Sequence, residues 1–384
     1  MNPLYENMTT SVFERMSLAA AKHGAVNLGQ GFPDFGWSQQ ILQAAARAVV
    51  EESGQYAPSR GLPILRQAVA DHYHRHQGLD ISPDQVCVTS GATEAIAAAL
   101  FATIVPGDEV IVLTPAYDAY VPLIRQAGGV PREVALRPPE WRVELDRIAE
   151  AVTGKTRAII FNNPHNPTGR LFDADELSSL AAVAVEHDLI IISDEVWEHI
   201  VFSGQPFTPL AALSGMAERT IKCGSAGKIF SLTGWKIGWL VAPPELASIA
   251  ARAHQFLTFT SAPSLQSAVA FGLTHGDSWL DPMRSGFAAA RDQMALALKI
   301  AGYAVLDSAA TYFMCIDLLK SGISADDVTF ANAAVEQAGV AVIPLSAFAE
   351  TEPPQHFIRL CFAKEPQTIA AGVEALIRAR RLFA

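Results

Sequence analysis

Hydrophobic positions between residues 85 and 245 alternate between short apolar runs and longer stretches with helical spacing. The runs are brief, β-branched and apolar at consecutive positions, which is typical of strands covered on both faces. They are Val86–Thr89, Val110–Thr114, Ala158–Phe161, Leu189–Ser193, Thr220–Cys223 and Ile237–Val241. Helices are expected between them at Ala92–Val105, Ala116–Ala127 and Ala174–His187, the last opening with the capping-box pair Asp173 and Glu176. This alternation predicts an α/β unit with a largely parallel sheet.

The pattern changes after Pro243 and Pro244, where helices dominate and strands become scattered. The spacing predicts helices at Glu245–Leu257, Ser264–Thr274 and Pro282–Ala301, and strands near Thr311–Asp317, Val340–Pro344 and Phe357–Phe362. The segment before residue 45 shows few periodic signals. We therefore expect a large domain at residues 45–285 and a smaller α+β domain formed by residues 1–44 together with residues 286–384.

Composition narrows the class of protein. Of the 384 residues, 50% are hydrophobic and 17% are charged, which supports a sizeable core and excludes intrinsic disorder. A net charge of −11 without a basic stripe argues against nucleic acid and anionic membranes as partners. The N-terminus lacks a signal-peptide pattern, and the longest apolar stretch, Ala95–Val105, is too short for a membrane span. A cytoplasmic enzyme is expected.

The cysteines indicate neither a disulfide framework nor a metal centre. They are scattered along the chain, form no C-x-x-C pair and have no histidine cluster beside them. Their positions are Cys87, Cys223, Cys315 and Cys361. We accordingly expect no metal site.

Ligands bind near the carboxyl ends of strands in sheets of this kind, so the residues after each strand are candidates. Gly91 permits a tight turn after the first strand, and the free N–H groups of Ala92 and Thr93 would then suit an anion, most naturally a phosphate. An ordinary capped turn explains the same residues. Neither this turn nor Gly29–Asp34 matches G-x-G-x-x-G, which weakens a dehydrogenase interpretation.

Three further strand ends carry polar residues that are candidates for catalysis or ligand binding. Asn162–Gly169 holds two prolines, which would fix Asn166 as a rigid amide donor. Asp194 is either a cap or ion-pair partner, or a counter-charge for a protonated ring nitrogen. Lys228 lies in a glycine-containing segment that lacks the P-loop spacing and is followed by Ile229, which disfavours an ATPase. This lysine is either a solvated surface residue or an amine nucleophile.

Six segments, taken in order, resemble class I pyridoxal-phosphate aminotransferases of fold-type I, most of all the kynurenine, glutamine and methionine branch. They are Asn27–Asp34, Tyr56–Pro58, Asn162–Gly169, Ser193–Val196, Ser225–Lys228 with Gly234–Lys236, and Ile358–Leu360. The resemblance runs from Val12 to the last helix. It implies a mostly parallel seven-stranded sheet between helices, a smaller α+β domain, and pyridoxal 5′-phosphate as cofactor.

The resemblance also implies roles for single residues. Lys228 would hold the cofactor as a Schiff base and later move the substrate proton, while Asp194 would pair with the pyridine nitrogen. Asn166 would bond the phenolic oxygen of the ring, and Tyr117 would stack on its face. Arg359 would bind the substrate α-carboxylate through two parallel hydrogen bonds.

The phosphate would lie on the amides of Ala92 and Thr93, with Ser225, Lys236 and, from a second subunit, Tyr56. A homodimer is therefore implied. Gly31 would approach the substrate closely because it has no side chain. The chain departs from the family at Trp197, where relatives usually carry a tyrosine that bonds the phenolic oxygen. An indole N–H can donate but cannot accept or ionise, so the geometry of this cofactor contact is open.

Aromatic positions suggest the substrate class. Phe13, Tyr56, Phe259 and Thr260 are expected around the substrate side chain, which favours methionine, aromatic or kynurenine, and glutamine side chains over dicarboxylic ones. Core packing is an equally good explanation for any single aromatic residue, and Arg15 and Arg60 are near enough in sequence to add a charge.

The expected reaction is transfer of the amino group of an L-amino acid to a 2-oxo acid. A carbon–sulfur β-lyase, which releases pyruvate and ammonia, would use the same lysine, aspartate and arginine. A non-catalytic regulator with this fold is a more remote alternative, because Lys228, Asp194 and Arg359 are all intact.

Overall fold

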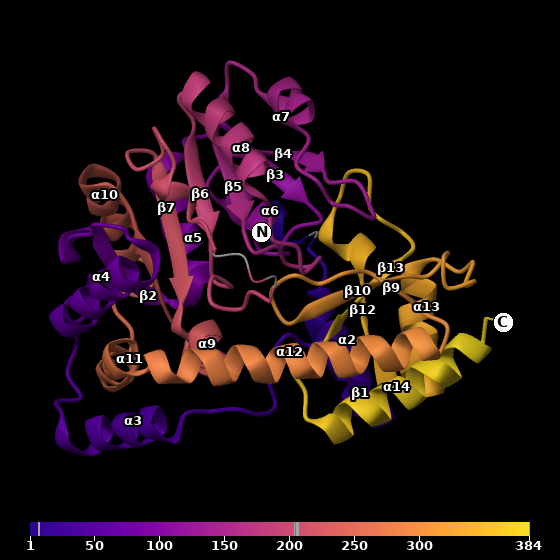
Figure 1. The fold of residues 1–384 in the computed structure, drawn as a ribbon. Coiled ribbons are helices and arrows are strands. Elements are labelled where there is room, and N and C mark those ends of the chain that lie inside the picture. Colours follow the sequence, from indigo (N-terminus) through magenta and orange to yellow (C-terminus); the bar gives the residue numbers. More distant parts are fainter. Residues whose placement is uncertain (7, 203, 205–206, 384) are drawn as a thin grey trace.

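A seven-stranded sheet forms the centre of the larger part of the molecule in this computed structural model, which describes residues 1–6, 8–202, 204 and 207–383 (Figure 1). The strands are β2 (Val86–Ser90), β3 (Glu109–Thr114), β4 (Val130–Ala135), β5 (Thr156–Asn162), β6 (Ile190–Asp194), β7 (Thr220–Ser225) and β8 (Ile237–Val241). Their order is β2-β8-β7-β6-β5-β3-β4. Only β8 runs antiparallel to its neighbours. The predicted α/β class and mostly parallel seven-stranded sheet are confirmed.

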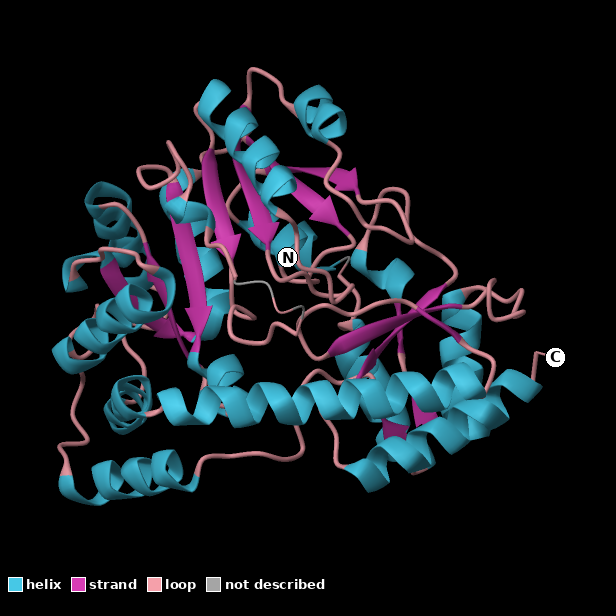
Figure 2. Cartoon of the chain, in the orientation of Figure 1, coloured by secondary structure: helices cyan, strands magenta, loops and turns pink. Residues whose placement is uncertain are grey.

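Helices cover both faces of this sheet, which explains why its strands are apolar at consecutive positions (Figure 2). On β6, Ile192 packs into the cluster shared with α5 and α10, whereas Ile191 packs into the opposite cluster shared with α8. The helices of this part are α4 (Pro63–Gln77), α5 (Gly91–Thr103), α6 (Tyr120–Gln126), α7 (Leu145–Ala151), α8 (Ala174–Glu186), α9 (Ala226–Ile229), α10 (Pro244–Gln255) and α11 (Pro263–His275). Short helical turns lie at η1 (Pro83–Gln85), η2 (Leu210–Ala212) and η3 (Thr233–Trp235).

The predicted elements of this part occur close to their expected positions, whereas several observed elements, among them α4, α7 and β4, were not predicted. The edge strand β4 was not expected, because its exposed and partly buried positions alternate and it contains Pro131, so it has no apolar run. Helix α6 begins at Tyr120 rather than Ala116. The predicted capping box is confirmed: the Asp173 carboxylate accepts from the Glu176 N–H at 2.9 Å, and the Glu176 carboxylate accepts from the Asp173 N–H at 3.0 Å.

The second part of the chain contains a four-stranded antiparallel sheet in the order β12-β13-β10-β9. Its strands are β9 (Ala304–Val305), β10 (Phe313–Asp317), β12 (Ile343–Pro344) and β13 (Phe357–Cys361), accompanied by α12 (Asp277–Ile300), α13 (Asp327–Ala333), η4 (Ala334–Ala338), η5 (Leu345–Phe348) and α14 (Pro366–Arg381). The single strand expected at Val340–Pro344 is two strands, because β11 (Val340–Ala341) pairs with β1 (Val26–Asn27) while β12 pairs with β13. Helix α12 starts five residues before Pro282, which lies inside it.

The N-terminal segment contacts both parts of the molecule. It holds α1 (Pro3–Glu6), α2 (Val12–His23) and α3 (Gln39–Glu51), more regular structure than its weak periodicity indicated. Helix α2 and β1 pack beside β11, whereas α3 packs on α11. Boundaries at residues 44 and 285 would therefore fall inside α3 and α12, and the expected domain division stays a proposal. Among the described helices, none is long and apolar enough to cross a membrane.

Candidate active site

A cavity of about 170 Å³ lies at the carboxyl edge of the seven-stranded sheet. The strands bring together side chains that are far apart in sequence, because the carboxyl ends of parallel strands meet at one edge. Every predicted cofactor contact except Tyr56 lines this cavity: Ala92, Thr93, Tyr117, Asn166, Asp194, Trp197, Ser225, Lys228 and Lys236.

One end of the cavity is built for an anion. Helix α5 opens there, so its first N–H groups face the cavity together with the ammonium group of Lys236 and the side chain of Ser225. Gly91, the first residue of α5, has a φ of +74°, and a Cβ at this position would lie 3.1 Å from Lys236 Nζ. A side chain at Gly91 would thus fill the space between the helix N-terminus and Lys236. The size and donor set of this cradle fit a phosphate group.

Asp194 lies on the cavity wall at the end of β6 and is 5% exposed. Burial raises the pKa of its carboxyl group, and a 2.5 Å hydrogen bond from the Tyr120 hydroxyl partly opposes that shift. A buried carboxylate of this kind is suited to a cationic partner such as a protonated ring nitrogen. Sequence analysis missed Tyr120, because only the packing of α6 against the sheet carries its hydroxyl to Asp194.

Lys228 lies on the short helix α9, and its side chain is half-buried in the cavity wall. Its Nζ donates to the Tyr312 hydroxyl at 3.0 Å and lies 4.5 Å from the centre of the Trp197 ring. Burial lowers the pKa of this amine to about 8. A much larger fraction is consequently neutral at pH 7 than for a surface lysine, as a nucleophilic amine requires. Tyr312, which precedes β10 in the second part of the chain, was also missed.

Arg359 on β13 is a buried cation, 1% exposed. It donates to the Asn166 side-chain oxygen and to the Gly29 carbonyl oxygen, both at 2.8 Å. Its guanidinium carbon lies 3.8 Å from the centre of the Phe313 ring. Among the described residues no carboxylate forms an ion pair with it, and burial lowers its pKa to about 10. A buried guanidinium without an anion is matched to a carboxylate ligand.

Phe13 and Gly31 lie beside this arginine. The Phe13 ring centre is 4.9 Å from the Arg359 guanidinium carbon, and its ring packs edge-on against Phe348, which sequence analysis did not single out. A Cβ at Gly31 would lie 2.7 Å from the Phe313 ring, so packing within the chain already requires glycine there. The suggested close approach of Gly31 to substrate stays a prediction.

The remaining predicted residues lie outside the cavity. Tyr56 is 84% exposed and Phe259 41% exposed, and the two rings pack edge-on with centres 5.5 Å apart. Thr260 is near them, within 3.5 Å of the Pro58 carbonyl oxygen. Arg60 donates to the Asp84 carbonyl oxygen at 2.7 Å, which holds its guanidinium at η1.

A second cavity of about 800 Å³ adjoins the first at Tyr117, which lines both. It is lined by residues of α2, α6 and η5, Arg15 among them, and by Asp118 in the loop before α6. Asp118 accepts from the Ser11 hydroxyl at 2.6 Å, whereas Arg15 has no carboxylate partner among the residues that the structure describes. Arg15 is thus available to a ligand in this cavity.

Comparison with known proteins agrees with this geometry. The family model for class I and II aminotransferases matches residues 23–376. The chain is 42% identical over 379 residues to a probable N-succinyldiaminopimelate aminotransferase from Mycobacterium tuberculosis, covering 96% of this chain and 95% of the relative. It is 37% identical over 369 residues to the methionine aminotransferase of Escherichia coli, with coverage of 96% and 95%.

Solved structures show the same relationship. The N-succinyldiaminopimelate aminotransferase of M. tuberculosis superposes with a TM-score of 0.95 at 42% identity, covering 99% of this chain and 100% of that one. An E. coli protein with methionine aminotransferase function superposes with a TM-score of 0.94 at 36% identity, with coverage of 98% and 99%. The chain belongs to the class I and II aminotransferase family. It is an enzyme that transfers amino groups with pyridoxal 5′-phosphate as cofactor.

Proposed function

We propose that this aminotransferase acts on L-amino acids with uncharged side chains of the methionine, aromatic or glutamine type, and passes the amino group to a 2-oxo acid. The observation that carries the proposal is the setting of Arg359. Its buried guanidinium has no anionic partner among the described residues and would bind the α-carboxylate, while the rings of Phe13, Phe313 and Phe348 surround it. Aromatic rings next to the carboxylate site favour apolar, aromatic, thioether or amide side chains over dicarboxylic ones.

The residues of the cavity are assigned cofactor roles on the basis of their placement. The cofactor, when bound, withdraws electrons from the substrate Cα. We assign its phosphate to the α5 amides, Ser225 and Lys236. Its ring nitrogen is assigned to Asp194 and its phenolic oxygen to Asn166. Its two ring faces are assigned to Tyr117 and to the side of the cavity that Trp197 lines. Because Asn166 Oδ1 already accepts from Arg359, its NH₂ group is left to donate to the cofactor.

Lys228 would move the proton in the reaction. Its Nζ lines the cavity and burial lowers its pKa to about 8, so it would take the proton from the substrate Cα and hold it for the second proton transfer of the reaction. The Tyr312 hydroxyl accepts from Lys228 Nζ and donates to the Gly31 carbonyl oxygen at 2.7 Å, which would orient the amine. Tyr120 would hold Asp194 in place from the opposite side.

The second cavity favours one other substrate class. The relative from M. tuberculosis carries N-succinyldiaminopimelate in its name, a longer molecule with additional carboxylates. Arg15 lines the 800 Å³ cavity that adjoins Tyr117, where a distal carboxylate of such a substrate could bind it. Substitution of Arg15 therefore distinguishes between the two candidate substrate classes.

The test is a half-reaction followed by absorbance. Cofactor-loaded protein is mixed with one amino donor and no oxo acid, and the yellow colour of the bound cofactor is recorded. L-methionine, L-phenylalanine and L-glutamine are expected to bleach the colour, and a 2-oxo acid to restore it. Fast bleaching by N-succinyl-L,L-diaminopimelate alone, slowed in Arg15→Met, would establish the second candidate instead. Release of pyruvate and ammonia from a cysteine conjugate would reveal β-lyase activity.

Arg359→Lys is expected to weaken the binding of every amino donor, because lysine cannot form two parallel hydrogen bonds to a carboxylate. We expect kcat/KM to fall by about 10²-fold, since hydrogen bonds to a charged group contribute roughly 1.5–3 kcal/mol each. Inhibition by simple monocarboxylates should weaken in parallel, whereas amines without a carboxylate should be unaffected. Equal losses for amines with and without a carboxylate would contradict the role.

We further propose that the active site is completed by a second copy of the chain. Tyr56, Phe256 and Phe259 expose aromatic rings on one part of the surface, 84%, 85% and 41% respectively, which is typical of an interface. Tyr56 would then reach the phosphate of the partner subunit. Sedimentation of the holoenzyme as a monomer would exclude this arrangement. A cytoplasmic location stays a prediction from the sequence.

A further inference from the structure

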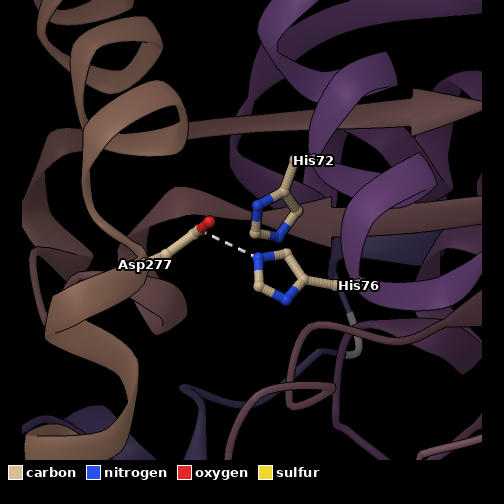
Figure 3. A group of neighbouring side chains, drawn as sticks. All are labelled: His72, His76 and Asp277. Atoms are coloured by element: carbon tan, nitrogen blue, oxygen red, sulfur yellow. Dashed lines mark hydrogen bonds and ion pairs between the residues drawn. The ribbon is translucent and has the colours of Figure 1, made fainter.

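A second group of ligand-type side chains lies between α4 and the start of α12, outside the active-site cavity (Figure 3). His72 and His76 are four residues apart on α4, so their rings lie on the same face of the helix. Asp277, the first residue of α12, faces them, and its Oδ1 lies 2.9 Å from His76 Nε2. Single ligand atoms of the three side chains lie within 4.8 Å of one another.

His72 has an unsatisfied ring nitrogen in this group. Its side chain is 2% exposed, and its Nε2 lies 2.7 Å from Nε2 of His199. Nδ1 is buried and has no hydrogen-bond partner among the described residues. Figure 3 shows a ring nitrogen of His72 turned toward the side on which Asp277 and His76 meet. Buried polar atoms are rarely left unpaired, so this nitrogen requires an explanation.

The contact between His72 and His199 suits a metal ligand. Both side chains are buried, and their Nε2 atoms lie within hydrogen-bond distance of each other. When His72 donates its Nε2–H to His199, its Nδ1 carries a lone pair. A ligating histidine is commonly held in this way, with its other nitrogen bonded to a second group.

We propose that His72 Nδ1, His76 Nε2 and Asp277 Oδ1 bind a divalent transition-metal ion of the zinc type. Two imidazoles and one carboxylate are a donor set that zinc prefers, whereas Mg²⁺ and Ca²⁺ select oxygen ligands. Water would occupy the remaining position, because the side chains of His76 and Asp277 are 25% and 50% exposed. Zinc bonds of about 2.0–2.2 Å require the ligands to move closer than 4.8 Å, which rotation of the two exposed side chains allows.

The charges around the group set the conditions for binding. Arg75 Nε lies 3.3 Å from Asp277 Oδ2, which orients the carboxylate and leaves Oδ1 facing the histidines. Arg75 and Arg284 oppose a cation, while Lys222 is already paired with Glu195 and Glu198. The site therefore offers one carboxylate and two imidazoles to a cation, with two guanidinium groups nearby.

A bound ion would join two segments that are 200 residues apart. It would tie α4, which packs beside the large sheet, to the first residue of α12, the long helix that runs on toward the small sheet (Figure 1). Since only the folded chain brings the three ligands together, the metal should stabilise the folded state.

The test uses cofactor-loaded protein freed of metal by chelation and dialysis. Calorimetric titration with ZnCl₂ at pH 7.5 is expected to show one ion per chain, and the thermal unfolding temperature should rise with zinc but not with Mg²⁺. His76→Ala and Asp277→Asn, both at exposed positions, should each lower the affinity by about 10-fold or more. Substituted Co²⁺ should give visible absorption bands typical of imidazole ligation.

His74→Ala is the matched control, because His74 lies on the same helix but its Nδ1 is 3.0 Å from Asp80, away from the group. It should bind zinc as the unaltered protein does. Absence of one-to-one binding by the unaltered protein would overturn the proposal. Binding that survives unchanged in both His76→Ala and Asp277→Asn would place the ion elsewhere and overturn it equally.

Discussion

Lys228→Ala is expected to lower kcat for amino-group transfer by about 10⁴-fold or more, because it removes both the amine that attaches the cofactor and the base that moves the substrate proton. The protein should still fold and bind the cofactor non-covalently, since the phosphate cradle and Asp194 are untouched. The measurement is single-turnover bleaching of cofactor-loaded variant by an amino donor. A small primary amine added to the buffer should restore part of the rate, because it can replace the missing base.

The same lysine predicts a pH dependence in the unaltered protein. Covalent uptake of the cofactor requires the neutral amine, and burial lowers the pKa of Lys228 to about 8. The uptake rate of cofactor-free protein should therefore rise with pH up to about 8 and level off above it. Lys299→Ala, at an exposed position on α12, is the matched control. It should change neither the rate of cofactor uptake nor the single-turnover rate of bleaching. A rise that continues to pH 10 would contradict the effect of burial.

Lys222→Met is expected to destabilise the fold by about 3–5 kcal/mol, because it leaves two buried carboxylates without a cationic partner. Lys222 is 1% exposed, pairs with Glu195, and donates to Glu198 at 2.6 Å. Burial alone would lower the pKa of Lys222, but the two carboxylates together raise it, so the ammonium stays charged. Urea unfolding followed by fluorescence or circular dichroism measures the loss.

The control removes all three charges at once. In a variant that combines Lys222→Met with Glu195→Gln and Glu198→Gln, no unpaired charge is left, so most of the lost stability should return. The glutamine side chains can still accept hydrogen bonds at the positions where Glu195 accepts from Ser193 and Glu198 accepts from Tyr73. Equal stability of the single and the triple variant would show that the cost comes from lost packing around the lysine.

Several elements could be predicted because their signals are local. The strand at Ile237–Val241 was predicted with its observed bounds, since it is buried at every position and bounded by turn residues. The capping box of α8 was predicted because two residues three positions apart, Asp173 and Glu176, contain all of its chemistry. By contrast, the edge strand β4 and the division of Val340–Pro344 between two sheets depend on which strand lies alongside, and no local spacing records that.

The sequence by itself determined the α/β class and the residues that follow each strand, and hence most of the cavity wall. Strand ends must converge at one edge of a parallel sheet, so Lys228, Asp194 and Asn166 could be placed together before the fold was known. Only the tertiary structure decided which side chains reach them from elsewhere. Tyr120 bonds Asp194 across 74 residues, Tyr312 bonds Lys228 across 84, and Asp277 meets His76 across 201. Such contacts depend on how helices and sheets pack, which periodicity along a single chain does not encode.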